Sequence, residues 1–88
     1  MDAHRIGQLR SLAYHREVAR RLEAQPGLVA EAGALAMRWI AEGNHAAPVL
    51  RTWVALLAGP RERLLALLGD DGEEATELRA CSPFARPL

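Results

Sequence analysis

The chain has 88 residues, which is enough for one small domain with a modest core. Half of the residues are apolar, which excludes a disordered chain, and the net charge is zero, so no overall field draws the chain to nucleic acid or membrane. Helix formers dominate, with 17 Ala and 14 Leu against four Val and two Ile. This composition predicts an all-α fold class.

Proline and glycine divide the chain into five predicted helices. Asp2 is a plausible N-cap for the first, and Pro26 and Pro48 suit the first turns of the second and third. Asp71 and Glu74 resemble a capping box before the last helix. We therefore expect a compact bundle of four to five short helices over residues 1–81, followed by an extended C-terminal tail, 82–88. The expected helices are 3–24, 26–42, 48–58, 61–68 and 73–81.

The second predicted helix is apolar around almost its whole circumference. Such a helix is typical of a buried position. Its main stripe is expected to pack inside the bundle, and the opposite side is expected either to pack there too or to form a homodimer or partner interface. The main stripe is Leu28, Ala32, Leu35 and Trp39, and the opposite side is Ala30, Ala34, Met37 and Ala41.

Charge is partitioned between the two ends of the chain. Residues 1–21 carry a net charge of +3, and residues 70–79 carry a net charge of −4. We expect the two segments to attract each other within the bundle. Arg5, Arg16 and Arg20 lie beside the apolar stripe of the first helix and form a basic face there.

Motifs for catalysis and metal binding are weak. The spacings Arg10–His15 and Arg38–His45 resemble the active-site signature of helical ribonucleases, yet His15 falls on the apolar stripe and is expected in the core or an interface. Cys81 is expected to be a buried structural thiol. The histidines and Cys81 lack paired ligand spacing, so the sequence predicts no catalytic residue, metal or cofactor, and a protein that is not an enzyme.

The C-terminal segment offers an aromatic residue after a helix stop. Pro83 ends the last helix, and Phe84 follows it. Phe84 either folds back as a plug on the helical core or serves as an anchor for a partner protein. The plug is the favoured alternative, because the last helix buries too little to hold itself in place.

Three blocks of the sequence resemble a family. They are Tyr14–Leu22, the central stretch from Trp53 to Leu68, and the stretch from Ala75 to Ala85 with its Ser-Pro-Phe-Ala. Together they are similar to small, largely uncharacterised helical bacterial proteins often encoded beside toxin–antitoxin genes. The resemblance implies a partner-binding, antitoxin-like role. The similar proteins continue with a further basic segment, and the resemblance leaves open whether this sequence is a shortened member.

These observations favour a cytoplasmic, non-catalytic protein–protein interaction module. A single Cys and the lack of an apolar signal core or membrane-spanning stretch support the location. A nucleic-acid-binding protein or ribonuclease using the Arg-rich first helix, and a structural homodimer, are the alternatives. Nucleic acid is the less favoured partner. The expected partner-binding residues are Arg5, Arg16, Arg20, Trp39, Trp53 and Phe84.

Overall fold

The computed structural model describes residues 2–84, and all regular structure in them is helical. The predicted all-α fold class is confirmed: the described residues form five helices and no strand. The ends of each predicted helix differ from those of the observed helix by at most two residues. The helices are α1 (Ala3–Leu22), α2 (Gly27–Ala41), α3 (Ala47–Ala58), α4 (Arg61–Gly69) and α5 (Glu73–Arg79).

The helix boundaries follow the local chemistry that the sequence suggests, with one exception. The Asp2 side chain accepts a hydrogen bond from the Arg5 amide at 2.7 Å, as expected of an N-cap. Gly43 ends α2 in the left-handed region, with a φ of 80°. The expected capping box before α5 is wrong, because Gly72 occupies the N-cap position without a side-chain cap. Asp70 instead accepts a hydrogen bond from the Gly72 amide and shapes the turn.

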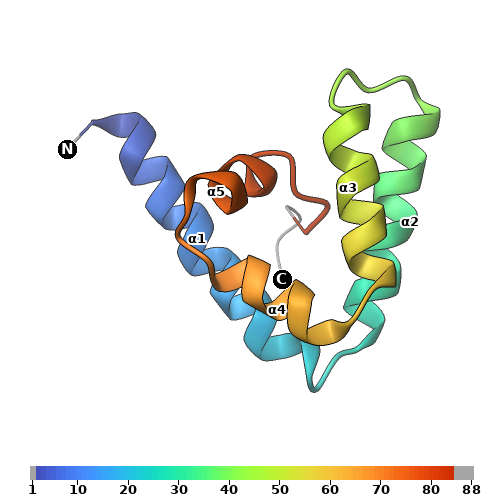
Figure 1. The fold of residues 1–88 in the computed structure, drawn as a ribbon, viewed down its shortest axis with the longest axis horizontal. Helices are drawn as coiled ribbons and strands as arrows, with labels where there is room; N and C mark the ends of the chain where they lie inside the picture. Colours follow the sequence, from blue (N-terminus) through green and yellow to red (C-terminus); the bar gives the residue numbers. More distant parts are fainter. Residues whose placement is uncertain (1, 85–88) are drawn as a thin grey trace.

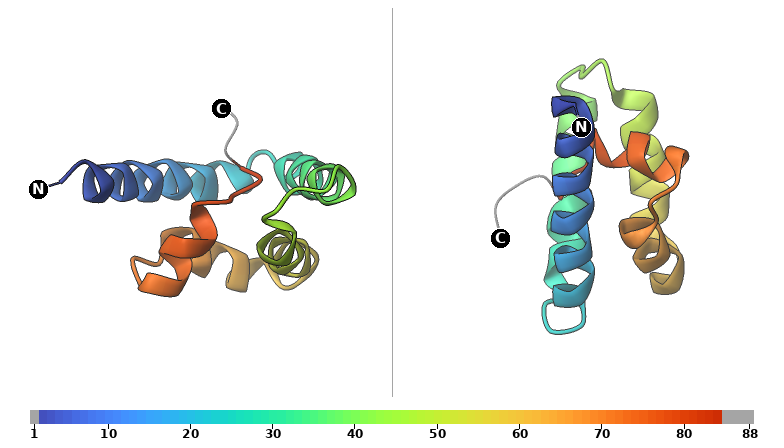
Figure 2. Two further views of the ribbon diagram at one scale, coloured as in Figure 1. Left: turned by 90° about the horizontal axis from the view of Figure 1, so that it is seen from above. Right: turned by 90° about the vertical axis from the view of Figure 1, so that its left-hand side faces the viewer.

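The five helices form two layers. α1 and α2 lie in one layer, and α3, α4 and α5 lie in the other, as the two views of Figure 2 show. α2 and α3 pack as an antiparallel hairpin on one side of the molecule, and α1 packs against α4 and α5 on the other (Figure 1). The two sides meet where α4 follows α3 and where the chain after α5, up to residue 84, passes between them.

The core lies where these elements converge. Trp53 of α3 is completely buried, and its indole nitrogen donates to the Leu78 carbonyl at 2.8 Å, which ties α3 to α5. Phe84 packs edge-to-face on Trp53, with ring centroids 6.1 Å apart. The buried core cluster is Val18, Leu22, Ala32, Trp53, Leu64, Leu68 and Phe84.

The first part of the predicted tail belongs to this core. Ser82, Pro83 and Phe84 are buried, and Phe84 is only 6% exposed. The structure thus places Phe84 as a plug in the helical core. Residues 85–88 of the predicted tail lie outside the described residues.

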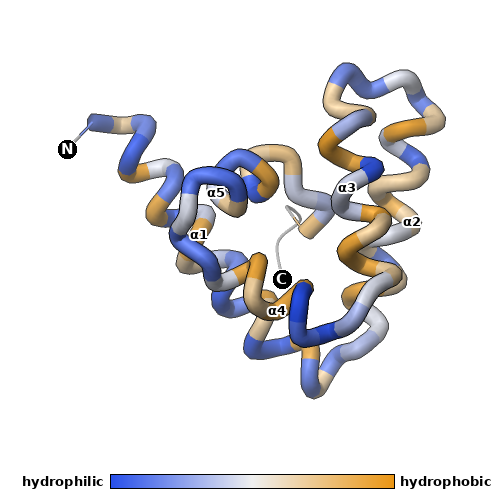
Figure 3. Tube along the Cα trace, in the orientation of Figure 1, coloured by the Kyte–Doolittle hydropathy of each residue, from blue (hydrophilic) through white to orange (hydrophobic). Residues whose placement is uncertain are grey.

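The second helix is buried on one side only, so the first alternative for its opposite side, packing inside the bundle, is wrong. Ala32, Leu35 and Ala36 face the core, whereas Met37 is 55% exposed. Apolar residues recur along α2 and α3 in Figure 3, but the hairpin stands at one side of the molecule and only its inner surface is covered. The outer face of α2, formed by Ala30, Ala34, Met37 and Ala41, is exposed.

Candidate functional site

The three aromatic residues expected at a partner interface do not form one exposed surface. Trp53 and Phe84 form the centre of the core, so neither is available as an anchor in this conformation. Their burial has a physical reason, since they fill the space where the two sides of the molecule meet. Trp39 is half-buried on the core side of α2. The exposed apolar side chain on α2 is Met37 instead.

A buried histidine joins the C-terminal segment to α1. His15 Nδ1 lies 2.7 Å from the Ser11 carbonyl, and its Nε2 lies 2.7 Å from the Ser82 hydroxyl. A carbonyl can only accept, so Nδ1 carries the proton and Nε2 accepts from Ser82. The Ser82 oxygen also accepts from the Phe84 amide, and the Tyr14 hydroxyl donates to the Phe84 carbonyl at 2.5 Å. These bonds hold Phe84 in place.

The His15–Ser82 pair has the geometry of a base beside a nucleophile, but its surroundings favour a structural role. Burial lowers the pKa of His15, the charge of Arg79 lowers it further, and the bond to the Ser11 carbonyl opposes the shift. His15 and Ser82 are only 3% and 2% exposed, so no substrate can reach the serine oxygen. The predicted core position of His15 is confirmed.

The basic face of α1 is divided among different contacts. Arg16 Nη2 donates to the Gly69 carbonyl at 3.0 Å, at the end of α4. Arg20 and Arg21 both pair with Glu17 on their own helix, and their hydrogen bonds lower the pKa of Glu17 to about 2. Arg5 lies further along α1 and is exposed. The three predicted arginines therefore do not form one free basic surface.

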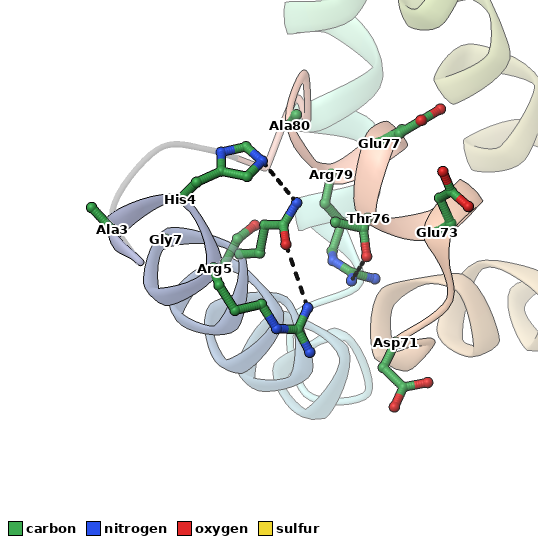
Figure 4. Close-up of a pocket in the computed structure, with 12 residues that line it drawn as sticks. Ala3, His4, Arg5, Gly7, Asp71, Glu73, Thr76, Glu77, Arg79 and Ala80 are labelled. Atoms are coloured by element: carbon green, nitrogen blue, oxygen red, sulfur yellow. Dashed lines mark hydrogen bonds between the residues drawn. The ribbon is translucent and has the colours of Figure 1, made fainter. Parts of the chain in front are cut away.

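A groove lies between the first turns of α1 and the segment containing α5. It has a volume of about 890 Å³ and is lined by residues within 3–11 and 71–80; we call it the α1–α5 groove. Figure 4 shows Arg5 and His4 on the α1 side, facing Thr76 and Arg79 on the α5 side. The oppositely charged ends of the chain are thus brought together. The ion pairs found within residues 2–84, however, both lie inside α1.

Arg79 is the residue of this groove that sequence reasoning missed. It is only 4% exposed, and its Nη1 donates to the carbonyls of Leu67 and Asp70 at the end of α4. Its Nη2 lies 3.3 Å from the Thr76 hydroxyl, and no described residue bonds its Nε. Burial lowers its pKa, which Asp70 and Asp71 partly offset. The sequence feature that could have indicated its role is that Arg79 is the single Arg in a short helix whose other charged residues are acidic.

The outer face of α2 is the second candidate surface. Its three alanines would let another helix approach closely, and Met37 adapts its shape to a partner. Glu31 and Arg38 flank this face on the same side, two helical turns apart, and both are exposed. This surface is apolar along its length and charged along one edge.

Membrane-spanning helices and metal sites are absent from the part of the chain that the structure describes. Within residues 2–84, no helix is long and apolar enough to cross a membrane, and no three His, Cys, Asp or Glu side chains are grouped so as to hold a metal ion.

Comparisons with known proteins found no relative. No family model matches the chain, and neither does any curated protein or solved structure. The resemblance to small helical bacterial proteins stays a prediction.

Proposed function

We propose that this protein is a non-catalytic protein-interaction module that docks an apolar helix of a partner on the outer face of α2. The observation that carries the proposal is the exposure of this face: Met37 is 55% exposed, more than any other large apolar side chain within residues 2–84. A regulatory, antitoxin-like role is the setting that the sequence resemblance suggests.

The surface suits a helix better than a small molecule. Because the side chains of the alanines at positions 30, 34 and 41 are small, a second helix can approach α2 closely on this face. Met37 lies on the same face, and its flexible side chain can adapt to the surface of the partner helix, as methionines at adaptable binding surfaces do. The arrangement provides contact area and no reactive group.

The test is a pull-down with the tagged full chain, comparing Ala34→Glu with Ala55→Glu. Both alanines are exposed in a helix, but Ala55 lies on α3, away from the proposed face. We expect Ala34→Glu to abolish capture of a partner that the unmodified chain and Ala55→Glu both retain. Equal capture by the two variants would refute docking through α2, and far-UV circular dichroism checks that both variants fold.

A structural homodimer is the second candidate, and the charged edge of α2 favours it. If two copies of α2 packed antiparallel about a two-fold axis near Ala34, Glu31 of each copy would face Arg38 of the other. The measurement is the mass in solution by light scattering. A dimer would be weakened by Glu31→Arg and restored by combining Glu31→Arg with Arg38→Glu, whereas a monomeric mass at all concentrations would exclude this candidate.

A further inference from the structure

The first turns of α1 extend beyond α4 and α5, and one side of them is left uncovered (Figure 1). Ile6 and Leu9 on this side are each 38% exposed, and Ala13, one turn after Leu9, is also exposed. At about 100° per residue, these three side chains lie on the side of the helix away from the buried His15. We call this side the outer face of α1. Apolar residues spaced by three and four positions are the pattern by which one helix packs along another.

Two free cations flank the outer face of α1, one on each side. By the same helical geometry, Arg5 and Arg10 lie about 70° to either side of its apolar residues. Within residues 2–84, the Arg5 side chain hydrogen-bonds only to Gln8, at 3.4 Å, and the Arg10 side chain makes no hydrogen bond or ion pair. Residues 3–16 contain no Asp or Glu. The face is therefore apolar along its middle and positively charged on both edges.

Contacts within the chain confine this free surface to the first half of α1. Arg16 donates to the Gly69 carbonyl, and Arg20 pairs with Glu17. These two arginines are already engaged, and Glu17 introduces a negative charge at the fourth turn. The free surface covers residues 5–13, which make about two and a half helical turns.

The chemistry of the outer face favours an acidic helix over other anionic partners. Two large aliphatic side chains are too few to hold a helix in a bilayer interface, and a nucleic-acid backbone would leave them uncovered. The chain also has no net charge, so it has no long-range attraction to either polyanion. A second copy of α1 is disfavoured, because its arginines would lie near those of the first copy.

We propose that the outer face of α1 binds an acidic amphipathic helix of a partner protein, packed alongside residues 5–13. The apolar stripe of the partner covers Ile6 and Leu9, and acidic residues on both sides of that stripe pair with Arg5 and Arg10. Acidic residues are required on both sides because the two arginines lie on opposite edges. This surface is separate from the outer face of α2, so the proposal goes beyond the proposed function and does not rest on it.

The experiment is an NMR titration of the ¹⁵N-labelled full chain with three designed helical peptides of about 18 residues, a length sufficient for a helix. The first peptide has a leucine stripe with glutamates on both sides. The second has the same stripe with lysines on both sides, and the third keeps the glutamates but has serines in place of the leucines. We expect saturable shifts of the amides of residues 5–13 with the first peptide, and binding weaker by roughly tenfold or more for the other two.

Variants connect the binding to named residues. Arg10→Glu should weaken the first peptide by roughly tenfold, because it replaces an attraction by a repulsion, and Leu9→Ala should weaken it by roughly fivefold. Two matched controls should leave its affinity unchanged. They are Arg51→Glu, at an exposed arginine on α3, and Met37→Ala, at the exposed apolar residue on α2.

Several results would overturn the proposal. They are the absence of saturable shifts in residues 5–13, equal binding of the glutamate and lysine peptides, and equal weakening by Arg10→Glu and Arg51→Glu. Weakening by Met37→Ala alone would place the peptide on the outer face of α2, which would support the proposed function instead. Vesicles containing phosphatidylserine and an RNA oligonucleotide are tested in parallel. Binding of either in place of the first peptide, lost in Arg10→Glu, would assign the surface to a polyanion.

Discussion

At the scale of single residues, the buried polar side chains of this protein form hydrogen bonds that connect segments distant in sequence. His15 and Ser82 are 67 positions apart in sequence and are joined by one hydrogen bond inside the core. In the neutral imidazole Nε2 accepts the proton of the serine hydroxyl, whereas a protonated imidazole would have to donate to the serine oxygen, so protonation of His15 reverses this bond inside the core. A polar pair in this position makes the attachment of the C-terminal segment dependent on protonation.

This dependence predicts that the protein loses stability in mild acid. The folded pKa of His15 lies below its ordinary value of 6.5, so below about pH 6.5 the unfolded chain binds a proton that the folded chain excludes. Stability is full above pH 6.5 and falls as the pH decreases toward the folded pKa, by up to about 1.4 kcal/mol per pH unit. Urea unfolding at about pH 7.5 and pH 5.5 measures the difference.

His15→Leu is the control for this prediction. Arg79, Tyr14, Ser11 and Ser82 surround His15, and none of these residue types changes charge between pH 5.5 and 7.5. The pKa of Glu17, about 2, also lies outside this window. The variant should therefore show a shallower loss of stability in acid. Equal slopes for the two proteins would assign the pH dependence to other groups.

At the scale of elements, the short helix α4 depends on arginines from its neighbours. Arg79 of α5 reaches the Leu67 and Asp70 carbonyls, and Arg16 of α1 reaches the Gly69 carbonyl. Positive groups at a helix C-terminus donate hydrogen bonds to its last carbonyls and interact favourably with the negative end of its dipole. Through these bonds α4 is connected to both α1 and α5.

The two arginines should differ in their contribution to stability. Arg79→Met should lower the free energy of unfolding by about 1–3 kcal/mol, because it removes two part-buried hydrogen bonds made by a buried charged side chain. Arg16→Met should cost less than about 1 kcal/mol, because the bond of Arg16 is exposed to water. Urea unfolding measures both values, and amide exchange in the last turn of α4 localises the effect. Equal costs for the two variants would contradict this account.

Sequence reasoning works well for the elements and less well for their contacts. Pro26, Pro48 and the glycines mark the helix boundaries because their backbone preferences are local. The role of Arg79 depends on carbonyls 9 and 12 positions away, and no local pattern specifies such a pairing. The composition of α2 did not decide whether its opposite side packs within the chain or faces another chain, because burial depends on how many neighbours surround the helix.

At the scale of the whole molecule, the two sides of the fold meet around Trp53 and Phe84. Trp53 belongs to the α2–α3 hairpin, Phe84 packs on its ring, and Tyr14 of α1 holds the Phe84 backbone. The C-terminal segment is thus part of the connection between the hairpin and the rest of the molecule. A domain of this size is expected to have a net stability of about 5–15 kcal/mol, so one core aromatic is a large fraction of it.

Phe84→Ala should therefore lower the free energy of unfolding by about 3–5 kcal/mol. Met37→Ala is the control, because Met37 is also a large apolar residue but is mostly exposed, and its cost should be within about 0.5 kcal/mol. Urea unfolding should be followed by far-UV circular dichroism, which reports all five helices, and by fluorescence, since Trp39 and Trp53 both lie on the hairpin. In the unmodified chain the two signals should coincide, because the shared core couples the hairpin to the other helices. A Phe84→Ala variant as stable as the unmodified chain would show that Phe84 is not needed as a plug and would restore the hypothesis that it is an anchor for a partner.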